Sequence, residues 1–260
     1  MEGKISVVIH TYNSEKYLER VLSSVKSFDE ILVCDMHSTD RTLEIANEYN
    51  CKIVYYDKYD IPEPARNFAI QSASNEWILV IDSDEVVPEA LYNYLYSLIK
   101  EKSDLQGLWL TRKNYILGHF LHADYPDYIL RFFRKDNSFW PPHVHSYPQI
   151  KGVVKRIPKR RKDLAIIHLV NSSMSVKLQK INIYTDDEVL RRAGQKFPIW
   201  KIFTASFFRF FKSYIIKGGI RDGKAGIIAA GMDAFYKFAT IAKVWESKVK
   251  DDDIDKDLIG

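Results

Sequence analysis

The chain has few of the residues that mark specialised protein classes. Only two of its 260 residues are cysteines, Cys34 and Cys51, which excludes a disulfide framework and favours a reducing compartment such as the cytoplasm. Its 11 glycines and 9 prolines are too few for a collagen-like or low-complexity chain. No run of 18 uncharged apolar residues is present, and the first residues lack the apolar core of a signal peptide. We therefore expect a folded cytoplasmic protein without a simple membrane span.

Aromatic residues and charges, in contrast, are abundant and unevenly distributed. Aromatic side chains make up 13% of the chain, and the net charge of +4 hides a strong asymmetry. Residues 1–150 carry 15 basic and 22 acidic side chains, residues 151–250 carry 22 and 7, and the tail 251–260 carries 1 and 5. A basic second half of this kind predicts an anionic partner, either a membrane surface or a nucleic acid.

Hydrophobic periodicity predicts an α/β fold for the first part of the chain. Apolar runs that predict strands alternate with segments of helical spacing. The apolar runs are residues 5–9, 31–34, 53–56 and 77–81. The helical segments are residues 17–25, 43–49, 65–73 and 89–101. Such alternation implies β-α-β units on a mostly parallel sheet. Residues 107–134 alternate like antiparallel strands, the apolar run 164–169 ends the sheet-like region, and residues from 174 onward are helical in pattern.

Polar residues follow three of the predicted strands. They are Thr11 to Glu15, Asp35 to Asp40, and Asp82 to Glu85. Ligands of open α/β sheets bind outside the carboxyl ends of the strands, so these residues are the candidates for a binding site. Within the second segment, Ser38-Thr39-Asp40 is typical of a cap for the following helix.

The segment Asp82-Ser83-Asp84 is the sharpest local signal. Two carboxylates one residue apart, at the exit of a buried strand, suit a hard divalent cation that holds substrate phosphates. The alternative is a turn that caps the next helix, because Asp and Ser are good capping residues and Pro88 can begin that helix.

Four segments together resemble the nucleotide-sugar half of family 2 glycosyltransferases. They are Thr11-Tyr12-Asn13, Asp35 with Ser38-Thr39-Asp40, Arg66-Asn67 and Asp82-Ser83-Asp84, spread over about residues 4–90. The resemblance implies the GT-A fold, an α/β domain with a Rossmann-like mixed sheet and helices on both faces. It implies nucleotide binding by Thr11, Tyr12, Asn13, Glu15, Asp35, Arg66, Asn67, Asp82 and Ser83. Asp84, assisted by Asp82, would hold Mg²⁺ or Mn²⁺ on the diphosphate.

The second half looks like the bacterial lipopolysaccharide-core glucosyltransferase group. The motifs are Pro126-Asp127-Tyr128, Leu130 to Arg134, Val144-His145, Ile167-His168-Leu169, Lys180 with Tyr184, and the glycine-containing segment 214–226. That group usually has a carboxylate directly after the His of the Val-His pair, a candidate general base, whereas Ser146 stands here. A hydroxyl does not accept a proton at neutral pH without its own base.

Three explanations of Ser146 stay open. Another carboxylate serves as the base, with Asp127 favoured over Asp124, or the acceptor differs, or transfer is impaired. His145, and less so His143, could orient acceptor hydroxyl groups, although a loop histidine often has only a structural role. In an inverting displacement the base lies across the site from Asp84.

Residues 200–217 predict an amphipathic helix. At 100° per residue the phenylalanines, Tyr214 and Ile215 fall on one half, and Lys201, Arg209, Lys212 and Lys217 on the other. Such a helix is typical of the membrane interface, and the alternative is packing on the catalytic domain. The basic run 159–162 is either a solvated loop or a further headgroup contact. The phenylalanines form a stripe instead of separate stacking platforms, so we expect a membrane and no nucleic acid.

We therefore predict an inverting, metal-dependent glycosyltransferase, peripheral at the inner face of a bacterial plasma membrane. It would use a nucleotide sugar, favoured to be UDP-linked, and a glycolipid or surface-glycan acceptor. The predicted parts are a nucleotide-sugar half (1–105), an acceptor half (106–172), a basic helical docking region (173–250) and an acidic tail (251–260). The alternatives are a nucleotidyltransferase and a catalytically silent protein that recruits a glycan-assembly complex to the membrane.

Overall fold

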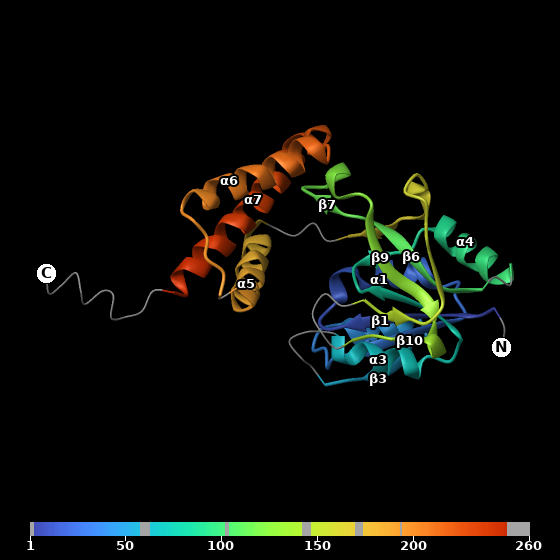
Figure 1. Cartoon of the computed structure of the whole chain (residues 1–260). Helices are drawn as coiled ribbons and strands as arrows, with labels where there is room; N and C mark the ends of the chain where they lie inside the picture. The colour runs from blue at the N-terminus through green and yellow to red at the C-terminus, as the bar shows by residue number, and fades with distance from the viewer. Residues whose placement is uncertain are drawn as a thin grey trace, which may run out of the picture. The chain divides into compact units, whose positions relative to one another are not determined.

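The computed structural model describes residues 3–57, 63–101, 104–141, 147–169, 174–192 and 194–248. The chain divides into two compact units (Figure 1). Unit 1 contains Met1–Asn114 and Tyr125–Val170, and unit 2 contains Tyr115–Asp124 and Asn171–Gly260. Unit 2 thus includes a short segment, Tyr115–Asp124, from the middle of the predicted acceptor half.

Unit 1 is the predicted α/β domain. Its main sheet is formed by β1 (Ile5–Thr11), β2 (Glu30–Asp35), β3 (Lys52–Tyr55), β4 (Trp77–Asp82), β5 (Glu85–Val86), β6 (Leu105–Lys113), β9 (Asp127–Arg134), β12 (Val153–Arg156) and β13 (Ile166–His168). Its helices are α1 (Glu15–Val25), α2 (Thr42–Glu48), α3 (Glu63–Ser72) and α4 (Glu89–Lys100). Short elements complete it: β10 (Ser138–Phe139), β11 (Gln149–Ile150), η2 (Lys135–Asn137) and η3 (Lys162–Leu164).

The sheet is mixed, with strand order β3-β2-β1-β4-β9-β6-β13-β5 and β12 beside β6. The first four strands of that order are parallel, which confirms the predicted β-α-β units. β9 runs antiparallel between β4 and β6, as the alternation in residues 107–134 predicted. The carboxyl ends of β1, β2 and β4 therefore lie at one edge, where the candidate ligand-binding residues follow them.

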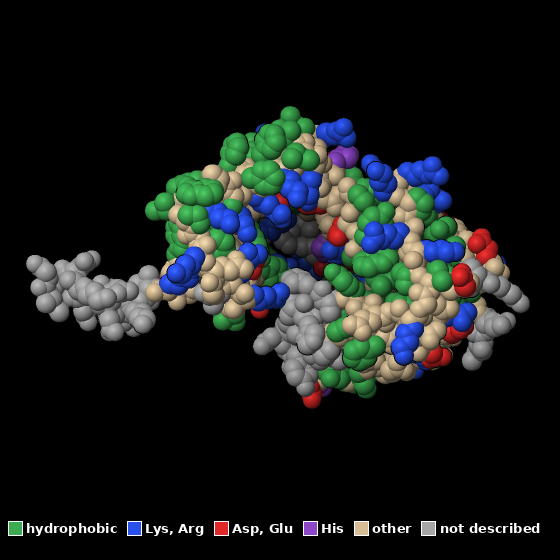
Figure 2. All heavy atoms as spheres, in the orientation of Figure 1, with side chains coloured by type: hydrophobic (Ala, Val, Ile, Leu, Met, Phe, Trp, Pro, Cys, Tyr) green, Lys and Arg blue, Asp and Glu red, His purple; other side chains and the backbone are tan. Residues whose placement is uncertain are grey.

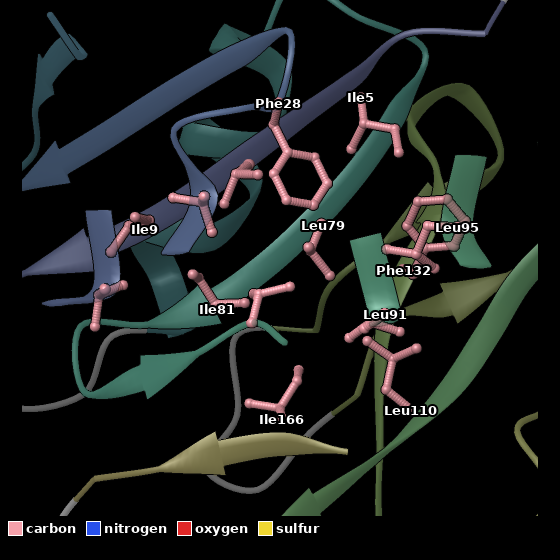
Figure 3. Close-up of a cluster of buried hydrophobic side chains, with 14 of the residues drawn as sticks. Ile5, Ile9, Phe28, Leu79, Ile81, Leu91, Leu95, Leu110, Phe132 and Ile166 are labelled. Atoms are coloured by element: carbon pink, nitrogen blue, oxygen red, sulfur yellow. The ribbon is translucent and has the colours of Figure 1, made fainter. Parts of the chain in front are cut away.

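The core of unit 1 covers both faces of this sheet. Ile9 and Leu79 pack in a cluster that includes residues of α1 and α4 (Figure 3). Their neighbours Val8 and Val80 point to the opposite face, where residues of α3 pack against them. Cys34 lies in this second cluster, and burial, with a smaller effect of the Asp35 carboxylate, raises the pKa of its thiol to about 12. The thiol is therefore a packing group and is not nucleophilic.

Unit 2 is mainly helical. It contains β7 (Tyr115–Ile116), β8 (His119–Phe120), η1 (His122–Asp124), α5 (Met174–Arg192), α6 (Trp200–Phe211), the π-helical segment η4 (Lys212–Ile216), η5 (Gly219–Asp222) and α7 (Gly223–Glu246). The single helix predicted over 200–217 is thus α-helical only to Phe211. Ile116 and Leu121 are buried against Ala225, which joins the β7–β8 segment to the helices.

The glycine-containing segment between η4 and α7 has a structural explanation. Gly218 ends η4 at φ +81°, in the left-handed region that glycine tolerates best. A Cβ atom on Gly226 would lie 1.8 Å from the Gly219 carbonyl oxygen, so the first turn of α7 must pack directly on η5. The Asp222 carboxylate accepts a hydrogen bond from the Ala123 backbone N–H (3.2 Å) and lies 2.6 Å from His122 Nδ1. The motif therefore fastens η1 to the helices of unit 2.

The outer surface of α6 is unusually apolar. Trp200, Phe203, Phe207 and Phe208 are 61%, 69%, 70% and 60% exposed, and Figure 2 shows apolar side chains gathered over this helix with Lys and Arg beside them. Phe210 departs from the predicted stripe because it is half-buried. Exposed apolar surface on this scale marks an interaction site.

One helical stretch among the described residues, Gly219–Glu246, is long and apolar enough to span a membrane, with 28% of its most apolar window buried. Core helices of soluble proteins are often as long and as apolar, so length and composition alone do not identify this helix as a membrane span.

Candidate active site

The carboxyl ends of β1 and β2 form the first wall of the candidate site. Thr11 Oγ1 donates to Asp35 Oδ1 (2.7 Å), and Ser38 donates to the same carboxylate through its backbone N–H (2.8 Å) and its hydroxyl (2.6 Å). Asp35 is fully buried. These bonds fix the carboxylate at the edge of the sheet, and its predicted contact with a nucleotide stays a prediction.

The loop after β1 is braced by the loop after β2. Asn13 adopts φ +48° and accepts a hydrogen bond from the Thr39 backbone N–H through Oδ1 (2.8 Å). Asp40 accepts from the backbone N–H groups of Glu15 (3.1 Å) and Thr42 (3.0 Å), at the first turns of α1 and α2. Asp40 therefore serves two helix starts, which agrees with its predicted capping role. Glu15 accepts from the Arg41 backbone N–H (3.1 Å), and its predicted nucleotide contact is untested.

Asp82, at the end of β4, is held by arginines. Arg131 of β9 donates to both of its carboxylate oxygens (2.9 and 3.3 Å), and Arg66 Nη2 of α3 lies 3.6 Å from Oδ1. Burial alone would raise the pKa of Asp82, but Arg131, Arg66 and Arg112 outweigh it and hold that pKa well below its usual range. The carboxylate is therefore ionised and already neutralised by Arg131.

The indole ring of Trp140 packs against Arg66 and Arg131. The Arg66 guanidinium carbon lies 4.4 Å from the centre of the indole ring and that of Arg131 lies 5.5 Å from it. Asn67 fixes the Trp140 backbone through two hydrogen bonds, one donated by its amide (2.6 Å) and one accepted by it (2.9 Å). Asn67 therefore positions the tryptophan, and its predicted nucleotide contact is untested.

Asp84 faces a histidine that the sequence analysis did not assign to the site. Asp84 Oδ2 lies 3.5 Å from His168 Nε2, and Asp84 Oδ1 is buried without a hydrogen-bond partner. The Leu169 backbone N–H donates to the Asp84 carbonyl oxygen (2.8 Å), which joins the end of β13 to the β4–β5 turn. His168 Nδ1 lies 3.1 Å from Asn114 Oδ1. If Nδ1 carries the ring proton, the lone pair of Nε2 faces Asp84.

A second ion-pair network borders this histidine. Arg112 of β6 lies 2.9 Å from both Glu85 Oε1 and Asp127 Oδ2. Asn114 also donates to Asp127 Oδ2 (2.9 Å), while Asp127 Oδ1 accepts no hydrogen bond from the described residues. Five carboxylates and three arginines gather here, with a formal charge of −2: Asp35, Asp82, Asp84, Glu85, Asp127, Arg66, Arg112 and Arg131. The excess of negative charge suits a cation.

His10 lies beside the arginines but carries no charge. Burial, followed by the positive charge of Arg66, lowers its pKa to about 3. The ring is therefore neutral at physiological pH, and it adds no third cation beside Arg66 and Arg131.

The structure brings most of the predicted residues together and shows what they touch. Ser83 accepts a hydrogen bond from the Ser14 hydroxyl (3.0 Å), and Tyr12 is 41% exposed directly after β1. His143, His145 and Ser146 lie outside the described residues. The sequence analysis missed His168 as a site residue, although it ends an apolar run as the other site residues do. Glu85 belongs to a predicted candidate segment and Arg131 to a quoted motif, but their ion pairs were not predicted, and Arg112, inside β6, carries no local signal.

Comparison with known proteins fits this geometry. The model of the family described as "Glycosyl transferase family 2" matches residues 6–157. The chain belongs to this family. A relative named an uncharacterised glycosyltransferase, from Rickettsia felis, is 25% identical over 95% of this chain and 91% of its own length. The lipopolysaccharide core biosynthesis glycosyltransferase LpsC of Rhizobium meliloti is also 25% identical, over 93% of this chain and 92% of its own.

A solved structure shares the fold. The mannosyltransferase PcManGT of Pyrobaculum calidifontis superimposes with a TM-score of 0.56 and 12% identity, covering 96% of this chain and 89% of its own. The predicted α/β architecture of GT-A type, with a helical carboxyl-terminal region, is therefore confirmed, as is the assignment of the chain as a family 2 glycosyltransferase.

Proposed function

We propose that this family 2 glycosyltransferase transfers a sugar, with inversion, from a UDP-linked donor in a reaction that depends on a divalent cation. The observation that carries the proposal is the Asp84–His168 pair. Asp84 Oδ1 is buried and accepts no hydrogen bond, which is costly unless a ligand restores a partner. A cation beside Asp84 and the His168 ring would restore that partner.

Two protein ligands are enough for such a cation. Among the described residues, no group of three or more His, Cys, Asp or Glu side chains is arranged to hold a metal. Mg²⁺ is commonly bound by one or two carboxylates together with substrate phosphates and water, and imidazole suits transition metals. Mn²⁺ or Mg²⁺ held by Asp84 and His168 would supply positive charge to a departing diphosphate. PcManGT was solved with GDP-Man and Mn²⁺, which supports the same class of donor and cation here.

The remaining residues of the edge have roles in the same proposal. Asp35 and the loop after β1 would contact the nucleoside, while Arg66 and Arg131 would add positive charge near the phosphates. Asn114 would orient His168 through the ring nitrogen that faces away from Asp84, as residues behind metal ligands commonly do. Asp82 would act mainly by keeping both arginines in place.

Asp127 is our candidate for the general base. Its Oδ2 is held by Arg112 and Asn114, and its Oδ1 is not engaged by the described residues. A positioned carboxylate with one open oxygen can accept the proton of an acceptor hydroxyl.

We place the acceptor, a glycolipid or lipopolysaccharide-type glycan, at the cytoplasmic face of an anionic membrane. The support is the α6 face, whose exposed Phe203, Phe207 and Phe208 would enter the headgroup region. Lys212 and Lys217 follow directly along the chain and are exposed, as cations at anionic headgroups require. This charge complementarity selects an anionic bilayer over a neutral one. The homology to LpsC supports the class of acceptor.

The test measures UDP binding by calorimetry with and without Mn²⁺. Asp84→Asn and His168→Ala should each weaken Mn²⁺-dependent UDP binding by about tenfold or more, since each removes a ligand to the ion. Asp104→Asn, an exposed carboxylate away from this edge, is the matched control and should bind as the unchanged chain does. Mn²⁺-dependent UDP binding that survives both substitutions would contradict the metal assignment. Release of pyrophosphate from a nucleoside triphosphate supplied together with a sugar 1-phosphate would favour a nucleotidyltransferase.

A further inference from the structure

Unit 2 contains a pocket of its own, with a volume of about 230 Å³. One wall comes from α5 through Lys177, Lys180 and Tyr184, and the other walls come from η1, η4 and α7. The volume lies below the range of about 300–1,000 Å³ for drug-sized ligands, which suits one sugar unit instead of an oligosaccharide.

Two lysines face this pocket at positions that do not favour stability. Lys177 and Lys180 are three residues apart on one face of α5, where like charges destabilise a helix. The Asp124 carboxylate, which lines the same pocket, attracts the Lys177 ammonium group but does not outweigh burial and Lys180. Lys177 is half-buried, and burial, more than the charge of Lys180, lowers the pKa of its ammonium group. Two adjacent cations in a pocket are an arrangement that an anion would stabilise.

The other walls are amphipathic and offer hydrogen-bond acceptors. Asp124 of η1 and Asp233 of α7 line the pocket, and Asp233 lies 3.8 Å from Arg209. Ile181 and Met232 add apolar surface. Carboxylates accept hydrogen bonds from sugar hydroxyl groups, and apolar side chains pack against the C–H groups of a sugar ring. An inorganic anion alone would leave these groups unused.

We propose that this pocket binds an anionic sugar unit of the acceptor, with Lys177 and Lys180 on its phosphate or carboxylate and Asp124 and Asp233 on its hydroxyls. The inference rests on the proposed function, because it names a chemical class within the proposed acceptor. Chain connectivity links the two sites. Ile116 of the pocket lies two residues after Asn114, and Asp124 of the pocket lies three residues before Asp127.

The experiment is calorimetric titration of the full chain with three soluble probes and one lipid. The probes are a hexose 6-phosphate, the same hexose without phosphate, and inorganic phosphate, and the lipid is short-chain phosphatidylglycerol below its micelle concentration. We expect the hexose phosphate to bind about tenfold or more tightly than the neutral hexose or inorganic phosphate, because it alone uses both walls. Tighter binding of the lipid than of the hexose phosphate would overturn the sugar assignment in favour of a headgroup.

Substitutions locate the binding. Lys177→Met and Lys180→Met keep the apolar stem and remove the charge, and each should weaken hexose phosphate binding by about tenfold. Lys224→Met, at the exposed start of α7, is the matched control and should change nothing. Unchanged binding in both pocket variants, or equal losses in all three, would overturn the proposal.

A second readout separates this proposal from the proposed function. Mn²⁺-dependent UDP binding should be intact in the lysine variants, because the residues assigned to the donor belong to unit 1. Loss of UDP binding in the Asp84 variant with normal hexose phosphate binding would support both assignments. Normal UDP binding with no hexose phosphate binding in the unchanged chain would remove the pocket proposal alone.

Discussion

Shortening two exposed phenylalanines on α6 should release the protein from anionic membranes without unfolding it. Phe203 and Phe207 are 69% and 70% exposed and lie one helical turn apart. Their replacement by alanine keeps a strong helix former and removes few contacts within the protein, so the cost in folding stability should be small.

The expected loss of membrane affinity follows from these exposures. Complete burial of a phenylalanine stabilises by about 1.5–3 kcal/mol, so the exposed parts of both side chains contribute about 2–4 kcal/mol on insertion. That range corresponds to a partition coefficient roughly 30- to 1,000-fold lower in Phe203→Ala with Phe207→Ala. Flotation with vesicles of phosphatidylcholine and phosphatidylglycerol, at several lipid concentrations, measures it directly.

The matched control removes equally exposed apolar side chains from a different helix. Ile183 and Leu190 of α5 are 63% and 79% exposed, and their replacement by alanine should alter flotation little. Vesicle binding that is unchanged in the α6 variant, or reduced equally in the α5 variant, would refute the reasoning. Binding that does not depend on phosphatidylglycerol would remove the part assigned to lysines and arginines.

Two further predictions concern stability. Gly226→Ala should destabilise unit 2 by about 1–3 kcal/mol in urea unfolding, because its Cβ would overlap the Gly219 carbonyl oxygen. Gly231→Ala is the control and should be neutral or stabilising, because a Cβ there meets nothing within 4 Å. Similar effects of the two substitutions would contradict the packing argument. His10→Gln should make the free energy of unfolding depend less on pH between pH 7 and pH 5. Native His10 resists protonation down to about pH 3, whereas the residue in the unfolded chain is protonated below about pH 6.5. This difference should cost the unchanged protein about 2 kcal/mol of stability over that range. Parallel stability curves for the two proteins over that range would show that His10 is not buried in a neutral state.

Local patterns in the sequence predicted much of unit 1. The alternation of apolar runs and helical spacing gave the four parallel strands and their helices, because each element is determined by residues near it in the chain. The rule that ligands bind at the carboxyl ends of strands made Asp35, Asp82 and Asp84 candidates for the site. Applied to every apolar run, the same rule also indicates His168, at the end of β13.

The ion pairs of the site could not be predicted in the same way. Arg131 contacts Asp82 because β9 lies antiparallel beside β4, and that pairing depends on strand order and register between segments about 50 residues apart. For the same reason the sequence could not show that Asp127 shares Arg112 with Glu85. The π-helical continuation of α6 was not predicted either, because neither proline nor glycine occurs within Lys212–Ile216 to mark it.

Because of the segment Tyr115–Asp124, unit 2 is not simply a carboxyl-terminal extension of unit 1. Because this segment leaves unit 1 after Asn114 and returns at Tyr125, the chain passes between the units three times, the third time after Val170. A truncation after Val170 would not yield a self-contained catalytic fragment, because Ile116 and Leu121 would lose the helix that buries them. The β7–β8 segment would remain between β6 and β9 with its apolar side chains exposed, which favours aggregation. A domain exchange that replaces unit 2 of this protein would therefore have to move two separate stretches of sequence together.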